Sequence, residues 1–176
     1  MRRFLAALVA LVAVLGLGAL LGLLWESLAP RVSLVVASDG KAYPEGYQPE
    51  GYMTDDGVAA LLCVAAGLIV GLASVWVARR IASRDHALLV ALASVLVLGA
   101  AGALALWWTG VTVGAFDFDA LLASSPEGTT LTAPLELRMP GVLVLWPLAS
   151  VLIVFLAAVG DWWRGRESER VDALAH

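Results

Sequence analysis

The residues of this chain best suited to chemistry are carboxylates in two polar stretches, residues 26–56 and 109–140. They are Glu26, Asp39, Glu45, Glu50, Asp55, Asp56, Asp117, Asp119, Glu127 and Glu136. Two carboxylates can act as acid and base on a glycosidic bond, and a cluster of them can bind Ca²⁺. Asp117-x-Asp119 is the best fragment of a metal site, but no spacing here matches a known metal-binding loop. We therefore interpret these carboxylates as solvated loop charges.

Histidine and cysteine are too sparse for nucleophilic catalysis or zinc binding. The two histidines, His86 and His176, lie outside both polar stretches, and the one cysteine, Cys63, lies within an apolar run. A Ser-His-Asp or Cys-His site needs a base beside its nucleophile, and a histidine zinc site needs several ligands. We therefore expect no catalytic residue, no metal and no cofactor, in a protein that is not an enzyme. A single cysteine also excludes a disulfide within the chain.

The elements that must position these residues are hydrophobic helices. Hydrophobic residues make up 61% of the chain and charged residues 15%, whereas about a quarter of a soluble domain is charged. Four runs contain no Asp, Glu, Lys or Arg: residues 4–25, 57–78, 87–108 and 141–160. At about 1.5 Å per residue, each helical run can cross a hydrocarbon layer of about 30 Å. We predict one all-α membrane domain over residues 1–176, a bundle of four transmembrane helices with small β-containing extracytoplasmic loops.

The first run could instead be a secretory signal, but its length argues against cleavage. The run from Phe4 to Trp25 exceeds the usual apolar core of a signal peptide, which is about 7–15 residues. The nearest small-residue site, Ser27-Leu28-Ala29, is followed by Pro30. We expect a retained helix with Trp25 at the far interface of the membrane. Because the four runs contain no ionisable group except the cysteine, ion-coupled transport is disfavoured.

Basic residues predict the orientation of the helices. They gather in three regions: Arg2 and Arg3; Arg79, Arg80 and Arg84 in the loop 79–86; and Arg164, Arg166 and Arg170 in the tail 161–176. With four spans these regions share one side, which the positive-inside rule makes cytoplasmic. Both termini of a multi-pass cell-membrane protein are then cytoplasmic, and residues 26–56 and 109–140 face outward. The arginines also favour contact with anionic membrane lipid, and they are not evidence for nucleic-acid binding.

The outward stretches contain strand signals. Residues 32–37 are rich in valine and precede Asp39-Gly40, which predicts a β-hairpin. Residues 130–138 alternate in polarity, which predicts an edge strand. A lone hairpin is marginally stable, so we expect the two loops to pair into a small sheet above the bundle. Between them, Asp117 is expected to cap a short amphipathic helical turn over residues 116–122.

A small repeat concentrates the aromatic residues of the first loop. Pro44-Glu45-Gly46-Tyr47 and Pro49-Glu50-Gly51-Tyr52 repeat one pattern, and Tyr43 precedes them. Proline and glycine are expected to keep this segment out of helix and sheet. Its tyrosines would lie either on the membrane surface or hairpin, or in an exposed patch for a partner or glycan. The candidate partner surface therefore comprises Tyr43, Tyr47, Tyr52, Asp117 and Asp119.

Helix two should begin near Gly57, with Asp55 and Asp56 accepting its free N–H groups. A stripe of small residues, Ala59, Cys63, Gly67 and Gly71, then recurs every four residues. Such a stripe permits close helix packing in lipid, here within the bundle more than between copies. In the last run, Trp146-Pro147 predicts a kink or a late helix start.

The four-span layout resembles a family of uncharacterised actinobacterial membrane proteins, classed as a domain of unknown function. The resembling segments are Asp39-Gly40 with Tyr43-Pro44-Glu45, then Asp55-Asp56-Gly57, and Trp146-Pro147-Leu148. The resemblance implies architecture and origin, and no activity.

The sequence favours an accessory or scaffold subunit of a membrane or envelope assembly that binds a protein partner through its outer loops. A small oligomeric channel or transporter is the alternative. The layout is two similar hairpins of helix, loop and helix, and whether they form a true repeat stays open.

Overall fold

The computed structural model of the chain describes residues 1–44, 49–81 and 84–174. Within these ranges four helices are long and apolar enough to cross a membrane, which confirms that part of the prediction. They are α1 (Arg2–Leu28), α2 (Pro49–Ile81), α3 (Arg84–Val113) and α5 (Leu145–Leu174). The smaller elements are β1 (Ser33–Val36), β2 (Ala42–Pro44), α4 (Phe118–Ser124), β3 (Thr130–Thr132) and the 3₁₀ turn η1 (Pro140–Val144).

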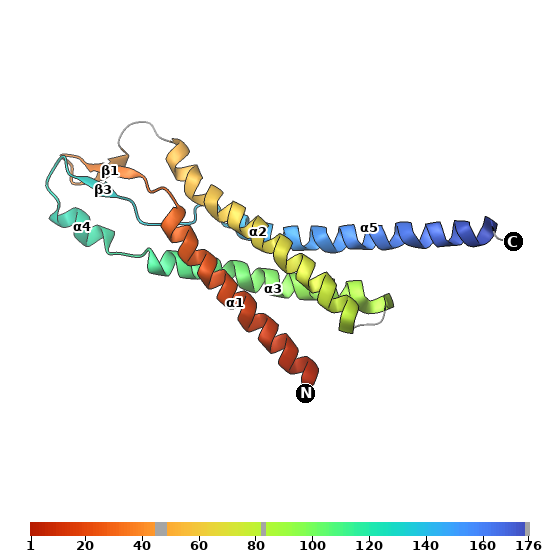
Figure 1. Cartoon of the computed structure of the whole chain (residues 1–176). Helices are drawn as coiled ribbons and strands as arrows, with labels where there is room; N and C mark the ends of the chain where they lie inside the picture. Colours follow the sequence, from red (N-terminus) through yellow and green to blue (C-terminus); the bar gives the residue numbers. More distant parts are fainter. Residues whose placement is uncertain (45–48, 82–83, 175–176) are drawn as a thin grey trace.

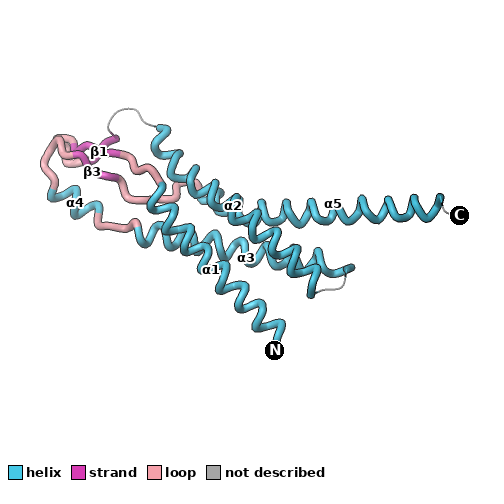
Figure 2. Tube along the Cα trace, in the orientation of Figure 1, coloured by secondary structure: helices cyan, strands magenta, loops and turns pink. Residues whose placement is uncertain are grey.

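All three strands lie at one end of the long helices, beside α4 (Figures 1 and 2). We call this part, residues 30–44 and 115–139, the cap. The N-terminal ends of α1 and α3 and the C-terminal ends of α2 and α5 lie away from it (Figure 1). The helices α1 and α3 therefore run toward the cap, and α2 and α5 run away from it.

The cap sheet joins the two loops. Its described strands have the order β2-β1-β3, and both neighbouring pairs are antiparallel. The predicted hairpin is confirmed, and Gly40 in its turn has φ +75°, a conformation that glycine adopts without strain. The predicted pairing across the loops is confirmed by the register of Leu34 with Leu131. Val32, Leu34 and Ala133 form the buried centre of the cap.

The third strand is shorter than predicted. After β3 ends at Thr132, the Ala133 N–H still donates to the Val32 carbonyl at 2.9 Å. Pro134 has no N–H to continue the ladder. The chain then turns into the bundle, where Leu135 is buried in the core that contains Trp25 and Trp146.

Three helix boundaries differ from the prediction. The helix α2 begins at Pro49 and includes half of the tyrosine repeat, so the expectation that proline and glycine exclude helix there was wrong. Proline is well tolerated in a first helical turn, where its missing N–H would be unpaired anyway. The helix α3 continues to Val113, and α5 continues through the charged tail to Leu174. The predicted late start of the last helix is confirmed, because α5 follows a 3₁₀ turn and begins at Leu145.

Helices joined by an outer loop are not the main packing partners. The largest interfaces join α1 with α3 and α2 with α5, so the prediction of two hairpins holds for connectivity and not for packing. A Cβ atom on Gly18 would lie 2.4 Å from the Gly102 carbonyl oxygen, and one on Gly67 would lie 2.4 Å from the Trp146 carbonyl oxygen. Both pairs of parallel helices thus meet backbone to backbone at a Gly-x-x-x-Gly pattern.

We expect Gly18→Ala to destabilise the bundle by about 1–3 kcal/mol, because the added methyl group forces α1 away from α3. Gly16→Ala is the matched control, since a Cβ atom there meets nothing within 4 Å. Thermal unfolding of both variants in detergent, followed by circular dichroism, measures the difference. Equal melting temperatures for the two variants would contradict the proposed packing.

Candidate functional site

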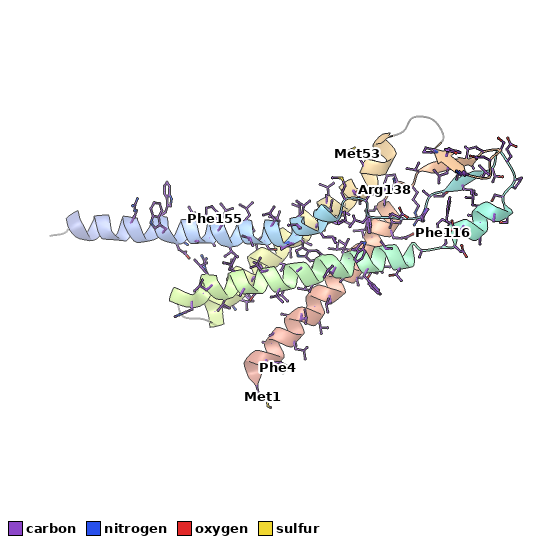
Figure 3. All side chains as sticks on the ribbon, turned by 180° about the vertical axis from the view of Figure 1, so that it is seen from behind. Met1, Phe4, Met53, Phe116, Arg138 and Phe155 are labelled. Atoms are coloured by element: carbon purple, nitrogen blue, oxygen red, sulfur yellow. The ribbon has the colours of Figure 1, made fainter. Side chains whose placement is uncertain are left out.

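Five charged residues and one tryptophan from distant parts of the sequence meet where the cap joins the helices. Trp25 and Glu26 come from the end of α1, Asp55 and Asp56 from α2, and Arg31 and Arg138 from the segments that enter and leave the sheet. We call these six residues the junction cluster. Figure 3 places Arg138 at this boundary, with Phe116 on the cap side.

Asp56 is hydrogen-bonded to the end of the second loop, residues 109–140. Asp56 is 3% exposed, and its two carboxylate oxygens accept hydrogen bonds from the backbone N–H groups of Arg138 at 3.2 Å and Met139 at 2.9 Å. An ionised acceptor makes such bonds stronger than those between neutral groups. The predicted capping of helix two by Asp55 and Asp56 was wrong, because α2 begins at Pro49 and both residues lie nearly two turns inside it.

Asp55 lies beside it and is almost as deeply buried. Asp55 is 8% exposed, and its Oδ1 atom has no hydrogen-bond partner among the described residues. Its backbone carbonyl accepts a hydrogen bond from the Trp25 indole at 2.8 Å. A buried carboxylate is costly unless charge or a proton compensates it. The charged side chains close enough to act on it are Arg138, Asp56 and Arg31.

Trp25 is the hydrophobic anchor of the junction. It was expected at the membrane interface, but it is fully buried. Gly110 makes room for the ring, since a Cβ atom there would lie 2.3 Å from the Trp25 Cε3 atom. The indole N–H has a partner in the Asp55 carbonyl, which allows a tryptophan to be buried without an unpaired donor.

The two arginines of the cluster are already paired. Arg31 bonds to Glu26, and its guanidinium lies over Gly114 at the end of α3. The Arg138 Nε atom lies 3.9 Å from the Glu136 carboxylate. Among the described residues, no group of three or more His, Cys, Asp or Glu side chains is placed to hold a metal ion. The arrangement is suited to fixing the cap on the helices.

The tyrosines of the predicted partner surface do not all lie on the cap. Tyr43 is exposed on β2, and its hydroxyl donates to Asp39 at 2.8 Å. This bond lowers the pKa of the Asp39 carboxyl, aided by the Lys41 N–H, and raises the pKa of Tyr43. Tyr47 lies outside the described residues. Tyr52 lies in the first turns of α2, and its side chain is also outside them.

Asp117 and Asp119 lie on the cap with Tyr43. Asp117 caps α4 as predicted, because its Oδ1 atom accepts a hydrogen bond from the Ala120 N–H at 2.9 Å. Asp119 is exposed in the first turn of α4. Phe118 packs against the buried residues of the sheet, so α4 and the hairpin form one body. The cap therefore presents Tyr43, Asp117 and Asp119 on a common support.

The small-residue stripe lies inside the bundle, against α5. Ala59 and Cys63 are fully buried. A Cβ atom on Gly71 would lie 2.9 Å from Ile153, and Gly67 accepts a hydrogen bond through its carbonyl from the Ser150 hydroxyl at 2.7 Å.

The topology arginines lie at the end away from the cap. Arg79 donates to both carboxylate oxygens of Asp161, at 3.0 and 2.9 Å, and thereby links α2 to α5. Arg80 stacks on the Trp76 ring at 3.8 Å. Arg84 begins α3, and its side chain is outside the described residues.

Sequence reasoning missed the role of the Asp55-Asp56 pair. The signal was present, because two adjacent aspartates stand at the edge of an apolar run, but local sequence assigns them to a helix end. The Gly18-x-x-x-Gly22 pattern in the first apolar run was also overlooked. No family model matches the chain, and no curated protein or solved structure shows significant similarity to it.

We expect Asp56→Ala to lower the free energy of unfolding by about 1–3 kcal/mol in total, because it removes the acceptor of two part-buried N–H groups. The loop that contains Arg138 should also become sensitive to proteolysis. Asp119→Ala is the control, because it removes an exposed carboxylate from the same cap. Thermal unfolding and limited proteolysis in detergent give both readouts, and equal behaviour of the two variants would refute a fastening role for Asp56.

Proposed function

We propose that the chain is an integral membrane protein whose extracytoplasmic cap is a fixed platform for a protein partner. It would serve as an accessory or scaffold component of a membrane or envelope assembly. The main supporting observation is that both loops build one cap, and that part-buried hydrogen bonds from Asp56 tie this cap to the helices.

The surface of the long helices supports membrane insertion. Large apolar side chains point outward along them, with exposed fractions of 65% at Leu20, 61% at Ile69 and 60% at Phe155. A soluble monomer rarely exposes so much contiguous apolar surface. Lipid chains would cover it, and the positive-inside rule would then place the arginine-rich end in the cytoplasm and the cap outside.

Rigidity supports a binding role for the cap. The Val36 N–H donates to the Thr129 carbonyl at 3.0 Å, and the Gly128 N–H donates to the Val36 carbonyl at 2.9 Å, so the bonds between the loops continue beyond β3. A surface that is ordered before binding loses less conformational entropy when a partner docks. Tyr43, Phe116 and Met139 are exposed on this ordered support.

The alternative, a small oligomeric channel or transporter, would place its path between copies. The buried polar or charged residues among those described are Asp55, Asp56 and Ser150. The first two lie at the junction, and Ser150 donates to backbone carbonyls. The interior of a single copy is therefore lined by apolar side chains.

Orientation can be tested with single cysteines in a Cys63→Ser background. We expect a membrane-impermeant maleimide to label Ser124→Cys, in the cap, on intact cells. Gly165→Cys, near the other end, should be labelled only after the membrane is opened. The opposite labelling pattern would overturn the orientation, and labelling of both positions on intact cells would overturn the four-span layout.

Partner binding can be tested by photocrosslinking in living cells. A photoreactive amino acid at Tyr43 or Asp119 should give a discrete protein adduct, whereas the same group at Leu20, which faces outward from α1, should not. Adding Asp56→Ala should weaken the Tyr43 adduct, because the cap is then less firmly held. Absence of any protein adduct from both cap positions, with the chain purifying as a bare monomer, would refute the platform function.

A further inference from the structure

A groove runs between α2 and α5 at the end away from the cap. Its volume is about 950 Å³. Leu72, Trp76, Ile153 and Leu156 line its apolar length. The small residues Ala73, Ala157 and Gly160 also line it. Leu72 is 60% exposed and Leu156 is 54% exposed, so the groove opens along the surface that would face lipid.

Positive charge gathers at one end of the groove. Arg79, Arg80 and Arg164 line it there, and Asp161 lies beside them. Asp161 accepts bonds from both Arg79 and Arg164, so one carboxylate serves two arginines. Arg80 stacks on Trp76, and no ion pair joins it to a carboxylate among the described residues. Among the residues whose side chains are described, three arginines and one carboxylate meet at this end, so positive charge is in excess there.

The order of these residues along the helices matches an amphiphile. Both α2 and α5 run away from the cap, so the apolar residues come first and the arginines follow at the interface. Leu72 and Arg80 are separated by about 12 Å along a helix that rises about 1.5 Å per residue. An apolar trough that ends in guanidinium groups complements an acyl chain that ends in a phosphate.

We propose that this groove binds one anionic phospholipid, with its phosphate between Arg80 and Arg164 and an acyl chain along Leu72, Ile153 and Leu156. The proposal rests on the membrane-spanning layout and is independent of the partner surface on the cap. Charge complementarity favours this occupant, because a neutral lipid or the apolar helix of a second copy would leave the arginine excess without a counter-ion.

The test uses delipidated full-length protein in detergent and two probes with the same chains, dioleoylphosphatidylglycerol and dioleoylphosphatidylcholine. Native mass spectrometry measures the dissociation constant of the first bound lipid. We expect phosphatidylglycerol to bind at least about tenfold more tightly. The single variants Arg80→Gln and Arg164→Gln should each reduce that preference by about fivefold, and the double variant should bind the two lipids about equally.

Two further variants separate the groove from general charge. Arg166→Gln removes one charge from α5 next to the site, but Arg166 stacks on Trp162 and does not line the groove, so the preference should persist. Gly160→Leu fills the groove where a Cβ atom has only Arg164 near it, at 3.9 Å, and should weaken both lipids. Circular dichroism checks that each variant is folded.

Several results would overturn the proposal. Equal affinity of the wild-type protein for the two lipids would do so. So would a loss of the preference for phosphatidylglycerol with Arg166→Gln as large as that with Arg80→Gln or Arg164→Gln. Competition by the free headgroup, glycerophosphoglycerol, at the same concentration as the lipid would show a plain anion site. If the protein is a dimer and Gly160→Leu leaves its dissociation constant for lipid unchanged, a second copy and not a lipid occupies the groove.

Discussion

Close contact between helix backbones is the constraint on which this structure depends. In a membrane, moving an apolar side chain from lipid into a helix interface gains little free energy, because the lipid tails are equally apolar. Helices therefore associate through packing and polar contacts. Gly18 and Gly22 bring α1 against α3, and Gly67 and Gly71 bring α2 against α5. Trp146 joins the two pairs, since its carbonyl meets Gly67 while its ring fills the space beside Gly102. A side chain at Gly18, Gly22, Gly67 or Gly71 would separate the backbones.

This pairing also explains the cap. Because α1 packs with α3 and α2 with α5, each outer loop crosses from one helix pair to the other. Both loops therefore pass over the same end of the bundle, where β1 and β3 meet. Asp56 and Trp25 then fasten this end through bonds to backbone groups. The buried charge of the junction cluster is thus a consequence of joining a polar sheet to apolar helices.

Much of this fold could be predicted from local sequence. The apolar runs predicted the four helices, and the valines before Asp39-Gly40 predicted the hairpin. Asp117 was correctly predicted as the N-cap residue of a short helix, α4. The junction could not be predicted, because the partners of Asp56 lie 82 and 83 residues away. The burial of Trp25 likewise depends on space left by Gly110 in another helix. Helix ends were misjudged where proline stood in a first turn or charged residues continued a helix.

Whether an exposed apolar side chain needs a protein partner depends on the solvent around it. The first long helix, α1, is the least buried of the four candidate spans, with 11% of its apolar window inside the bundle. In lipid this face needs no protein partner, because acyl chains cover it. On the cap, which the proposed orientation places in water, Tyr43, Phe116 and Met139 are exposed without acyl chains to cover them. The exposed residues of the cap therefore support the proposed protein binding, and the groove beside Arg80 supports the proposed lipid binding.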